Sequence, residues 1–478
     1  NHRTILEGRH EEFDSSLKTE NRCRPGASPG YWLCALIPMA YLVSGFRYPS
    51  SSNTYMYKFT VLTALGLNLQ AVTYFLHLNT HCSRMIRFLY AFLPGVVTAG
   101  LLMFVMHQNL LVSIVWGMGF PLGYHLIYIK ILKELPQSFT LGEASIIVQG
   151  FVLFVLNAVL QIPYIYREPP KTELSQMNAI MMVALFVLTI ECLIVWLIPI
   201  FRTIYLFYPL MVVTVTAICI IPVIGEPALV TLINFISSDL RRVFLIILFA
   251  GLTGLALSAV SWQVGKSSKA STAVRKIFHI LVVCVFIPGL IFQCTLMYIA
   301  SGVGLAFLIV LEMLRLVKLP PFGEALNSSF EVFADEKDAG ILALTPFYLL
   351  VGCSIPMWIS PCTCSLTDTA GDNLIPLLSG VLSIGIGDSA ASIVGTMIGR
   401  HKIPGKRSKK SVEGVIASIL LQGLTVYCLI YLGLLRLSSY QLAITSTAVV
   451  LTSILEALTD QVDNIIVPLV FFIISSLS

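Results

Sequence analysis

Long, uninterrupted apolar runs dominate the chain from residue 32 to its end. A transmembrane helix needs about 20 mostly apolar residues, whereas a membrane-barrel strand shows about ten residues of alternating hydrophobicity. The runs do not alternate, so they predict an all-α fold, a polytopic transmembrane helical bundle. We expect roughly 13 to 15 membrane helices, since runs within 88–129 and within 203–236 could merge or be re-entrant. The candidate runs are 32–46, 59–78, 88–106, 109–129, 144–164, 177–200, 203–224, 243–263, 277–293, 295–314, 341–359, 374–394, 414–435, 440–458 and 464–477.

Polar residues divide the chain into three parts. Residues 1–30 are polar, charged and without periodicity, and they are too polar for the core of a signal peptide, so we expect a mobile soluble tail. Residues 31–264 have short connections and few polar residues, which predicts an N-terminal transmembrane region. Residues 265–478 contain four polar clusters between apolar runs and form the region in which we expect the chemistry.

Composition strengthens the membrane assignment. Hydrophobic residues make up 56% of the 478 residues and charged residues 12%, against about a quarter charged in soluble domains. The mean hydropathy is +0.86. A soluble, disordered or nucleic-acid-binding protein is therefore excluded, and the net charge of +5 gives no case for nucleic acid. The eleven cysteines form no paired CxxC pattern, so most are expected to be small buried hydrophobes.

The four polar clusters are predicted to face one compartment. They lie at 265–279, 315–340, 385–414 and 456–464, and two apolar runs separate each from the next. The first and third clusters are rich in Lys and Arg, whereas the opposite loop 360–373 has neither, which places the clusters in the cytoplasm. Cys362 and Cys364 would then be lumenal, and we expect free thiols because a disulfide between such close positions would be strained.

The third cluster combines a small-residue helix face with a basic loop. Small residues recur at every fourth position, at Gly387, Ala391, Gly395 and Gly399, which would let another helix approach closely. Asp388 lies beside this face, and an aspartate in a membrane helix usually has a partner or a task, although a simple helix cap is the alternative. The following loop, GRHKIPGKRSKKS, has six basic residues among glycines and suits a polyphosphate. The alternative is an anchor for anionic lipid headgroups.

The other clusters supply acidic and further basic groups. One helical face is expected to carry Glu456, Thr459 or Asp460, and Asp463, with Asn464 beside it. Carboxylates in such positions hold Mg²⁺ against a nucleotide or accept a proton from a hydroxyl. Solvated charges at a helix end are the alternative. Further candidates come from the first two clusters. In the first they are Arg275, Lys276 and His279, as phosphate contacts or a juxtamembrane anchor. In the second they are Asp335 and Asp338, as site residues or a surface turn. Together the clusters predict phosphoryl or nucleotidyl transfer to a lipid.

Several of these stretches resemble one known family. GIGDSAASIVGTMIGRHKIPGKRSKKSVEG at 385–414 resembles the CTP-binding region of the dolichol kinases. VRKIFH at 274–279, FADEKDAG at 333–340 and ILEALTDQVDNIIVPL at 454–469 resemble other segments of that family, and SFTLGEAS at 138–145 is a shorter match. The resemblance covers residues 265–478 closely, while the first half matches mainly in hydropathy. Two features depart from the family pattern: two extra residues in the loop before Lys409, and the charge of Asp460.

The resemblance implies transfer of a phosphoryl group from CTP to dolichol, giving CDP and dolichyl phosphate, with Mg²⁺ as cofactor. Dolichyl phosphate is the lipid carrier for protein N-glycosylation and related mannosylation, so the endoplasmic reticulum membrane is the implied location, with the active site facing the cytoplasm. The implied CTP-binding residues are Gly395, Thr396, Gly399, Arg400, Lys402, Pro404, Gly405, Lys406, Lys409, Lys410, Ser411, Glu413 and Gly414.

The resemblance also suggests catalytic roles. Asp388, Asp463 and Lys410 are the expected catalytic residues, with Asp388 and Asp463 as Mg²⁺ ligands or one of them as the base for the dolichol hydroxyl. Two other functions remain open. A CTP-dependent lipid cytidylyltransferase would release pyrophosphate instead of CDP. A transporter would place its polar residues at mid-membrane in two related halves, whereas here they gather at one face of one half.

Overall fold

The computed structural model describes residues 23–49, 54–80, 84–168, 170–222, 225–266, 268–334, 338, 340–361, 363–365, 367–403 and 410–478. Throughout these ranges the regular structure is helical, and the only extended pairings are two isolated bridges, Pro222 with Pro227 and Lys402 with Ser411. The predicted all-α membrane bundle is therefore confirmed.

The described residues hold ten helices that are long and apolar enough to cross a membrane, or up to eleven if the bent pair Gly371–Leu377 and Val381–Met397 forms one span. This number is lower than the 13 to 15 expected. The difference lies in four predicted runs that form helices of only 12 to 17 residues: Leu36–Arg47, Ile204–Ile220, Leu344–Ile359 and Asp463–Ser475. At about 1.5 Å per residue, none of these covers a hydrocarbon core of about 30 Å.

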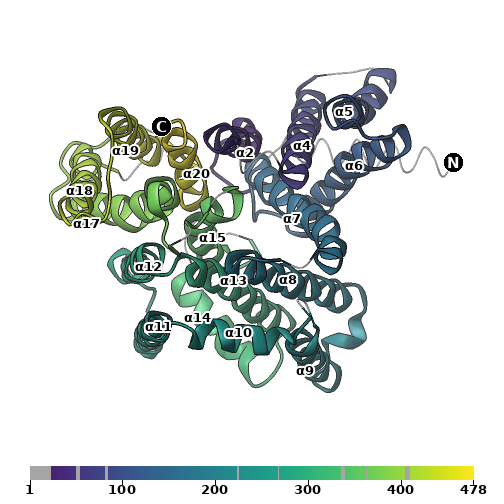
Figure 1. The fold of residues 1–478 in the computed structure, drawn as a ribbon. Helices are drawn as coiled ribbons and strands as arrows, with labels where there is room; N and C mark the ends of the chain where they lie inside the picture. The colour runs from purple at the N-terminus through teal and green to yellow at the C-terminus, as the bar shows by residue number, and fades with distance from the viewer. Residues whose placement is uncertain are drawn as a thin grey trace. The chain divides into compact units, whose positions relative to one another are not determined.

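The chain folds as two compact units. The first unit runs to Asn157 and also includes the short segments Asp335–Leu342 and Asp460–Val462. Its helices are α2 (Leu36–Arg47), α4 (Tyr55–Asn79), α5 (Arg84–Val105), α6 (Leu110–Glu134) and most of α7 (Leu141–Arg167) (Figure 1). α5 packs against both α4 and α6. Thr98 lies where a Cβ on Gly66 would be, so this glycine lets α4 and α5 approach closely.

A buried ion pair joins distant segments within the first unit. Arg24 Nη2 lies 2.6 Å from Glu143 Oε1, and both side chains are about 95% buried, with exposed fractions of 5% and 4%. Glu143 Oε1 also accepts a hydrogen bond from the backbone N–H of Val462 at 2.8 Å, and Arg24 donates to the carbonyl of Asp460 at 3.1 Å. The last residues of the expected N-terminal tail are therefore packed, whereas residues 1–22 lie outside the described part of the chain.

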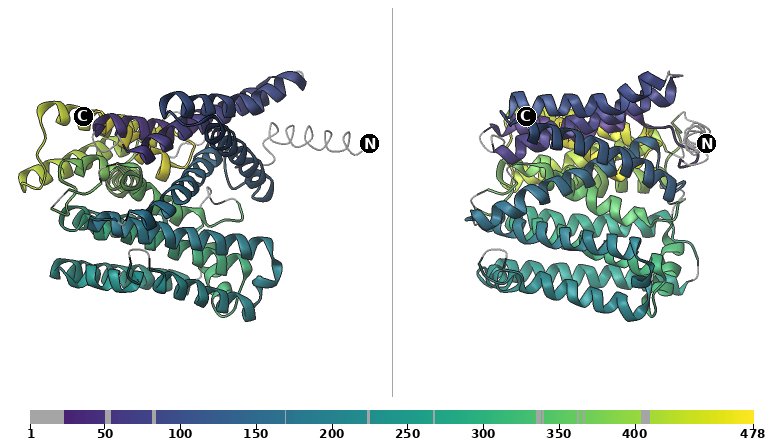
Figure 2. Two further views of the ribbon diagram at one scale, coloured as in Figure 1. Left: turned by 45° about the vertical axis from the view of Figure 1, so that its right-hand side comes forward. Right: turned by 90° about the vertical axis from the view of Figure 1, so that its right-hand side faces the viewer.

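The second unit contains the remaining helices. Its long helices are α8 (Glu173–Leu197), α11 (Leu240–Gly265), α12 (Thr272–Phe292), α13 (Cys294–Val317), α18 (Val412–Tyr431) and α19 (Ser439–Leu458). Its shorter ones are α9 (Ile204–Ile220), α10 (Ala228–Ser237), α14 (Phe322–Phe333), α15 (Leu344–Ile359), α16 (Leu374–Leu377), α17 (Ser389–Met397) and α20 (Asp463–Ser475). The teal helices of this unit run roughly parallel to one another in both views of Figure 2.

Local sequence explains where several of these helices begin. Ser271 caps α12 by accepting from the N–H of Val274, and Ser411 caps α18 in the same way. Thr172 with Ser175 and Ser438 with Gln441 form reciprocal capping boxes at the starts of α8 and α19. Side-chain oxygens thus satisfy N–H groups that have no partner within the helix.

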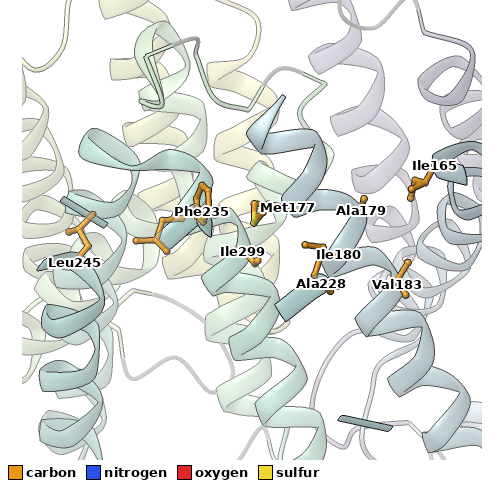
Figure 3. Close-up of a cluster of buried hydrophobic side chains, with 10 residues drawn as sticks. Ile165, Met177, Ala179, Ile180, Val183, Ala228, Phe235, Leu245 and Ile299 are labelled. Carbon is orange, nitrogen blue, oxygen red and sulfur yellow. The ribbon is translucent and has the colours of Figure 1, made fainter. Parts of the chain in front are cut away.

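An apolar cluster packs α8, α10, α11 and α13 together. Its buried members come from these helices and from the end of α7 (Figure 3): Ile165, Met177, Ala179, Ile180, Val183, Ala228, Phe235, Leu245, Leu296 and Ile299. In a bilayer such contacts hold helices together through dispersion and close packing.

One end of the second unit is held by polar contacts and a disulfide. Arg242 pairs with Glu173 at 2.5 Å and with Asp368 at 3.2 Å. A disulfide joins Cys294, the first residue of α13, to Cys364. The expectation that Cys364 is a free thiol is therefore wrong: its partner is 70 positions earlier in the chain, so sequence proximity to Cys362 did not matter. Cys362 lies outside the described residues.

Candidate active site

A π-helix lies at the centre of the predicted chemistry. This element, η4 (Val381–Asp388), leads directly into α17, and α12, α18, α19 and α20 all pack against it. Single π-helical turns are often found at functional sites. Glycines allow the close packing: a Cβ on Gly385 would lie 2.6 Å from the Val283 side chain, and one on Gly380 would lie 2.5 Å from the backbone of Cys353.

The small-residue face predicted from residue 387 to residue 399 packs against the start and middle of α18. A Cβ on Gly399 would lie 2.5 Å from Ser411 Oγ, and one on Gly387 would lie 2.4 Å from Gln422 Nε2. From the other side, a Cβ on Gly414 would lie 2.7 Å from the carbonyl oxygen of Ala391. The expected close helix approach is confirmed, and it fixes α17 against α18.

Asp388 ends η4 and is paired with two basic residues from α12. Lys276 Nζ donates a hydrogen bond to Asp388 Oδ2, and His279 Nε2 lies 3.4 Å from the same oxygen. All three side chains are largely buried, and the exposed fraction of Asp388 is 15%. The Asp388 side chain makes no capping hydrogen bond to α17, so the simple helix cap is excluded. The aspartate is instead one half of a buried ion pair.

A second charged group forms around Lys410, at the entrance to α18. Lys410 Nζ lies 2.5 Å from Glu456 Oε1 and 3.7 Å from Asp463 Oδ2. Burial by itself lowers the pKa of Lys410, but the negative charges of Glu456, Asp463 and Asp388 outweigh it and raise this pKa above its ordinary value. Lys410 is therefore an ammonium ion at neutral pH, in electrostatic contact with three carboxylates.

The acidic residues near the C-terminus do not share one helical face, contrary to the prediction. α19 ends at Leu458, its cap Thr459 is extended, and α20 starts at Asp463, so Glu456 and Asp463 come from different helices. Asp460 belongs to the first unit, where Ser28 donates to both of its carboxylate oxygens. Glu456 and Asp463 instead meet at Lys410.

The two ends of the basic loop form a short hairpin. Ile403 N–H donates to the carbonyl of Lys410 at 3.1 Å, and Val412 N–H donates to that of His401 at 2.9 Å. Glu413 accepts hydrogen bonds from the backbone and the imidazole of His401. Arg400, Lys402 and Thr396 are exposed, whereas Ser411 and Gly414 are buried in the α17–α18 contact. Pro404, Gly405, Lys406 and Lys409 lie outside the described residues.

The remaining predicted residues fall in three places. Arg275 is half-buried beside Lys276, and its carbonyl lies 3.3 Å from His279 Nδ1. Asn464 is buried at the start of α20, where its backbone carbonyl approaches Gly352. Asp338 is buried in the first unit, and Asp335 lies outside the described residues.

The carboxylate oxygens of Asp388 and Asp463 are the type of ligand that a hard divalent cation binds. Within the described part of the chain, no three His, Cys, Asp or Glu side chains lie together as a metal-binding group. Mg²⁺, however, is usually held by one or two carboxylates together with substrate phosphates. Asp388 and Asp463 are oxygen donors of that kind, and both charges act on Lys410.

Sequence reasoning missed three polar residues beside this site. Ser418 and Gln422 on α18 and Ser453 on α19 are buried and hydrogen-bonded to one another. A signal was present, because a glutamine interrupts the apolar run 414–435, and a buried amide in a membrane helix needs a partner.

Comparison with known proteins identifies the family of this chain. The family model for dolichol kinase matches residues 34–402. The dolichol kinases of Mus musculus and Homo sapiens are 30% and 31% identical over 391 and 394 residues, which is 79% of this chain and 73% and 72% of theirs. The dolichol kinase of Bos taurus is 30% identical over 92% of this chain and 84% of its own. No solved structure matches the chain. The chain is a multi-pass membrane protein and belongs to the dolichol kinase family.

Proposed function

We propose that this chain transfers the γ-phosphoryl group of CTP to the terminal hydroxyl of dolichol in the endoplasmic reticulum membrane, supplying dolichyl phosphate for N-glycosylation and mannosylation. One observation carries the proposal. Lys410, at the end of the basic loop just before α18, lies beside Glu456 of α19 and Asp463 of α20, and the charge of Asp388 also stabilises its ammonium group. Phosphoryl transfer depends on positioning and on neutralising charge, and this group of side chains offers both.

In the proposed reaction, the dolichol oxygen forms a bond to the γ-phosphorus while the bond from that phosphorus to the β,γ-bridging oxygen breaks. CDP leaves with the electron pair of the broken bond. The hydroxyl proton goes to a carboxylate, for which Asp388 and Asp463 are the candidates. Lys410 offsets the negative charge of the transferring phosphoryl group, and Lys276 and His279 hold Asp388 in place.

The basic loop is the proposed nucleotide site. Arg400 and Lys402 are exposed on its described part, as a triphosphate ligand requires, while Gly395 and Gly399 bring the backbone against Ser411. The family implies a nucleotide donor, and CTP is our choice because the loop resembles the CTP-binding region of dolichol kinases. Where one of Asp388 and Asp463 accepts the proton, the other would hold Mg²⁺ together with the substrate phosphates, and the cation would neutralise phosphate charge when bound.

The proposed orientation has the site in the cytoplasm. Lys276 lies near the start of α12, and the disulfide of Cys294 lies just beyond its end, roughly 27 Å away at 1.5 Å per residue. Disulfides persist in oxidising compartments such as the endoplasmic reticulum lumen, and basic residues favour the cytoplasmic side. Both observations support an orientation in which the start of α12 faces the cytoplasm and its end faces the lumen.

The test is a CTP-dependent assay with purified protein in micelles containing dolichol. We expect lipid monophosphate and CDP from the wild type, and losses of at least about 100-fold in kcat for Lys410→Ala and Asp388→Asn, because each removes a charge from the site. Arg436→Ala is the control, as it removes a positive charge far along the chain from the loop. Pyrophosphate release would identify a cytidylyltransferase instead, and near-normal activity of both variants would contradict the assigned roles.

A further inference from the structure

Helices α18 and α19 lie side by side in the second unit (Figure 1), and three buried polar side chains connect them. Gln422 Nε2 donates to Ser418 Oγ and to Ser453 Oγ, both at 3.0 Å, and the two hydroxyl groups are also 3.0 Å apart. Each residue is at most 2% exposed. Polar groups inside a membrane are costly and frequently functional, so this cluster calls for a role.

The cluster touches the backbone immediately before Asp388. A Cβ on Gly387 would lie 2.4 Å from Gln422 Nε2 and 2.9 Å from Ser418 Oγ. The absence of a side chain at Gly387 therefore lets the amide of Gln422 support the last turn of η4. Asp388 is the next residue in the chain.

The same cluster lies close in sequence to Glu456. Ser453 precedes Glu456 by three positions on α19, which is about one helical turn. Gln422 thus packs against the backbone next to Asp388 and hydrogen-bonds to Ser453, on the helix that carries Glu456. A shift of this amide would alter the distance between the two ion pairs of the site.

One polar atom of the cluster makes no hydrogen bond to the described residues. Gln422 Oε1 is buried and has no hydrogen-bond partner among the described residues. A buried acceptor without a partner destabilises a fold, and an apolar side chain of similar size would avoid that cost. Stability alone therefore does not account for a glutamine at this position.

We propose that Gln422 is a positioning residue for phosphoryl transfer, which with Ser418 and Ser453 holds Gly387 so that Asp388 keeps its place relative to Glu456. This inference rests on the proposed function. The amide does not need to touch the substrates: it acts through the backbone of η4, and small displacements of reacting groups slow such reactions strongly.

The first experiment compares Gln422→Met and Ser453→Ala with Thr452→Val. Thr452 is the matched control, because it is also buried on α19 but its hydroxyl bonds only to backbone carbonyls of its own helix. We expect kcat to fall about tenfold or more in the two cluster variants. The KM for CTP should change less than about twofold. The unfolding temperature of Gln422→Met should stay equal to that of the wild type or rise.

The second experiment tests the contact itself. Gly387→Ala should lower kcat because its methyl group displaces the amide of Gln422. In the double variant Gly387→Ala with Gln422→Ala, the amide is absent and only the Ser418 hydroxyl remains close to the added methyl group, so the loss in kcat should be smaller than the product of the two single losses.

The outcomes separate this inference from the proposed function. A folded wild type that phosphorylates no dolichol with CTP overturns the proposed function. If the wild type is active, three results overturn the inference: full kcat in Gln422→Met, an equal loss in Thr452→Val, or multiplicative losses in the double variant. A loss of kcat confined to the cluster variants, with thermal stability retained, supports it.

Discussion

At the residue scale, the site consists of buried and half-buried charges whose partners come from distant parts of the chain. Asp388 pairs with Lys276, 112 positions earlier, and Lys410 pairs with Glu456, 46 positions later. Sequence reasoning identified all four residues as candidates because charged groups are rare in the apolar second half. It assigned Lys276 and Lys410 to phosphate, however, whereas the structure places both on carboxylates.

The Asp388–Lys276 pair leads to a prediction about stability. Asp388→Ala leaves the Lys276 ammonium buried without its partner, so we expect a loss of about 3 kcal/mol in the free energy of unfolding. The double variant Lys276→Met with Asp388→Leu removes both charges and should recover most of that loss. Thermal unfolding in detergent measures both effects.

Activity provides the contrast for the same variants. The double variant should remain inactive in the dolichol kinase assay, because it regains stability but still lacks the Asp388 carboxylate. Recovered activity would show that Asp388 is a structural residue only. An unfolding temperature as low as that of Asp388→Ala would show that the two charges do not act as a pair.

At the element scale, small residues set how closely α17 and α18 approach. The four-residue spacing of the small positions predicted this contact, because positions four apart share a helix face. The spacing did not predict the π-helix before it, nor that the partner would be α18. A π-helix depends on the packing of Gly380, Gly385 and Gly387 against three different neighbours, which no local pattern records.

Two glycines of α18 offer a matched pair of substitutions. Gly414→Ala places a methyl group 2.7 Å from the carbonyl of Ala391, so α17 must move, and we expect a loss of about 1–3 kcal/mol in stability together with reduced activity. Gly423→Ala meets nothing within 4 Å and should be neutral or slightly stabilising, since alanine favours helix. Thermal unfolding of the two variants side by side measures the difference. Equal effects would mean that the α17–α18 contact does not limit stability.

At the scale of the whole molecule, the described chain comprises two units, and each contains a buried ion-pair network. The first unit includes Asp460–Val462 through the Arg24–Glu143 pair. In the sequence, only the short family match SFTLGEAS, which contains Glu143, pointed to one member of this pair. The partner, Arg24, lies in a segment whose composition predicted a mobile tail.

Membrane orientation can be tested with single introduced cysteines. In sealed microsomes, Lys402→Cys should react with a membrane-impermeant maleimide added outside, because we place the basic loop in the cytoplasm. Asp372→Cys, exposed near the disulfide loop, should react only after permeabilisation. The wild type controls for its native cysteines. The reverse pattern, or labelling of both positions from one side, would contradict the proposed orientation.

The sequence by itself determined the membrane bundle, the small-residue face and the identity of most charged candidates. These features follow from local properties: hydropathy adds along the chain, and helical spacing fixes which neighbours share a face. Only the tertiary structure decided that Cys364 bonds to Cys294, that Glu456 and Asp463 meet at Lys410 from two helices, and that Gln422 packs against Gly387. These contacts depend on how helices far apart in the chain pack against one another, and a local sequence pattern carries no information about that packing.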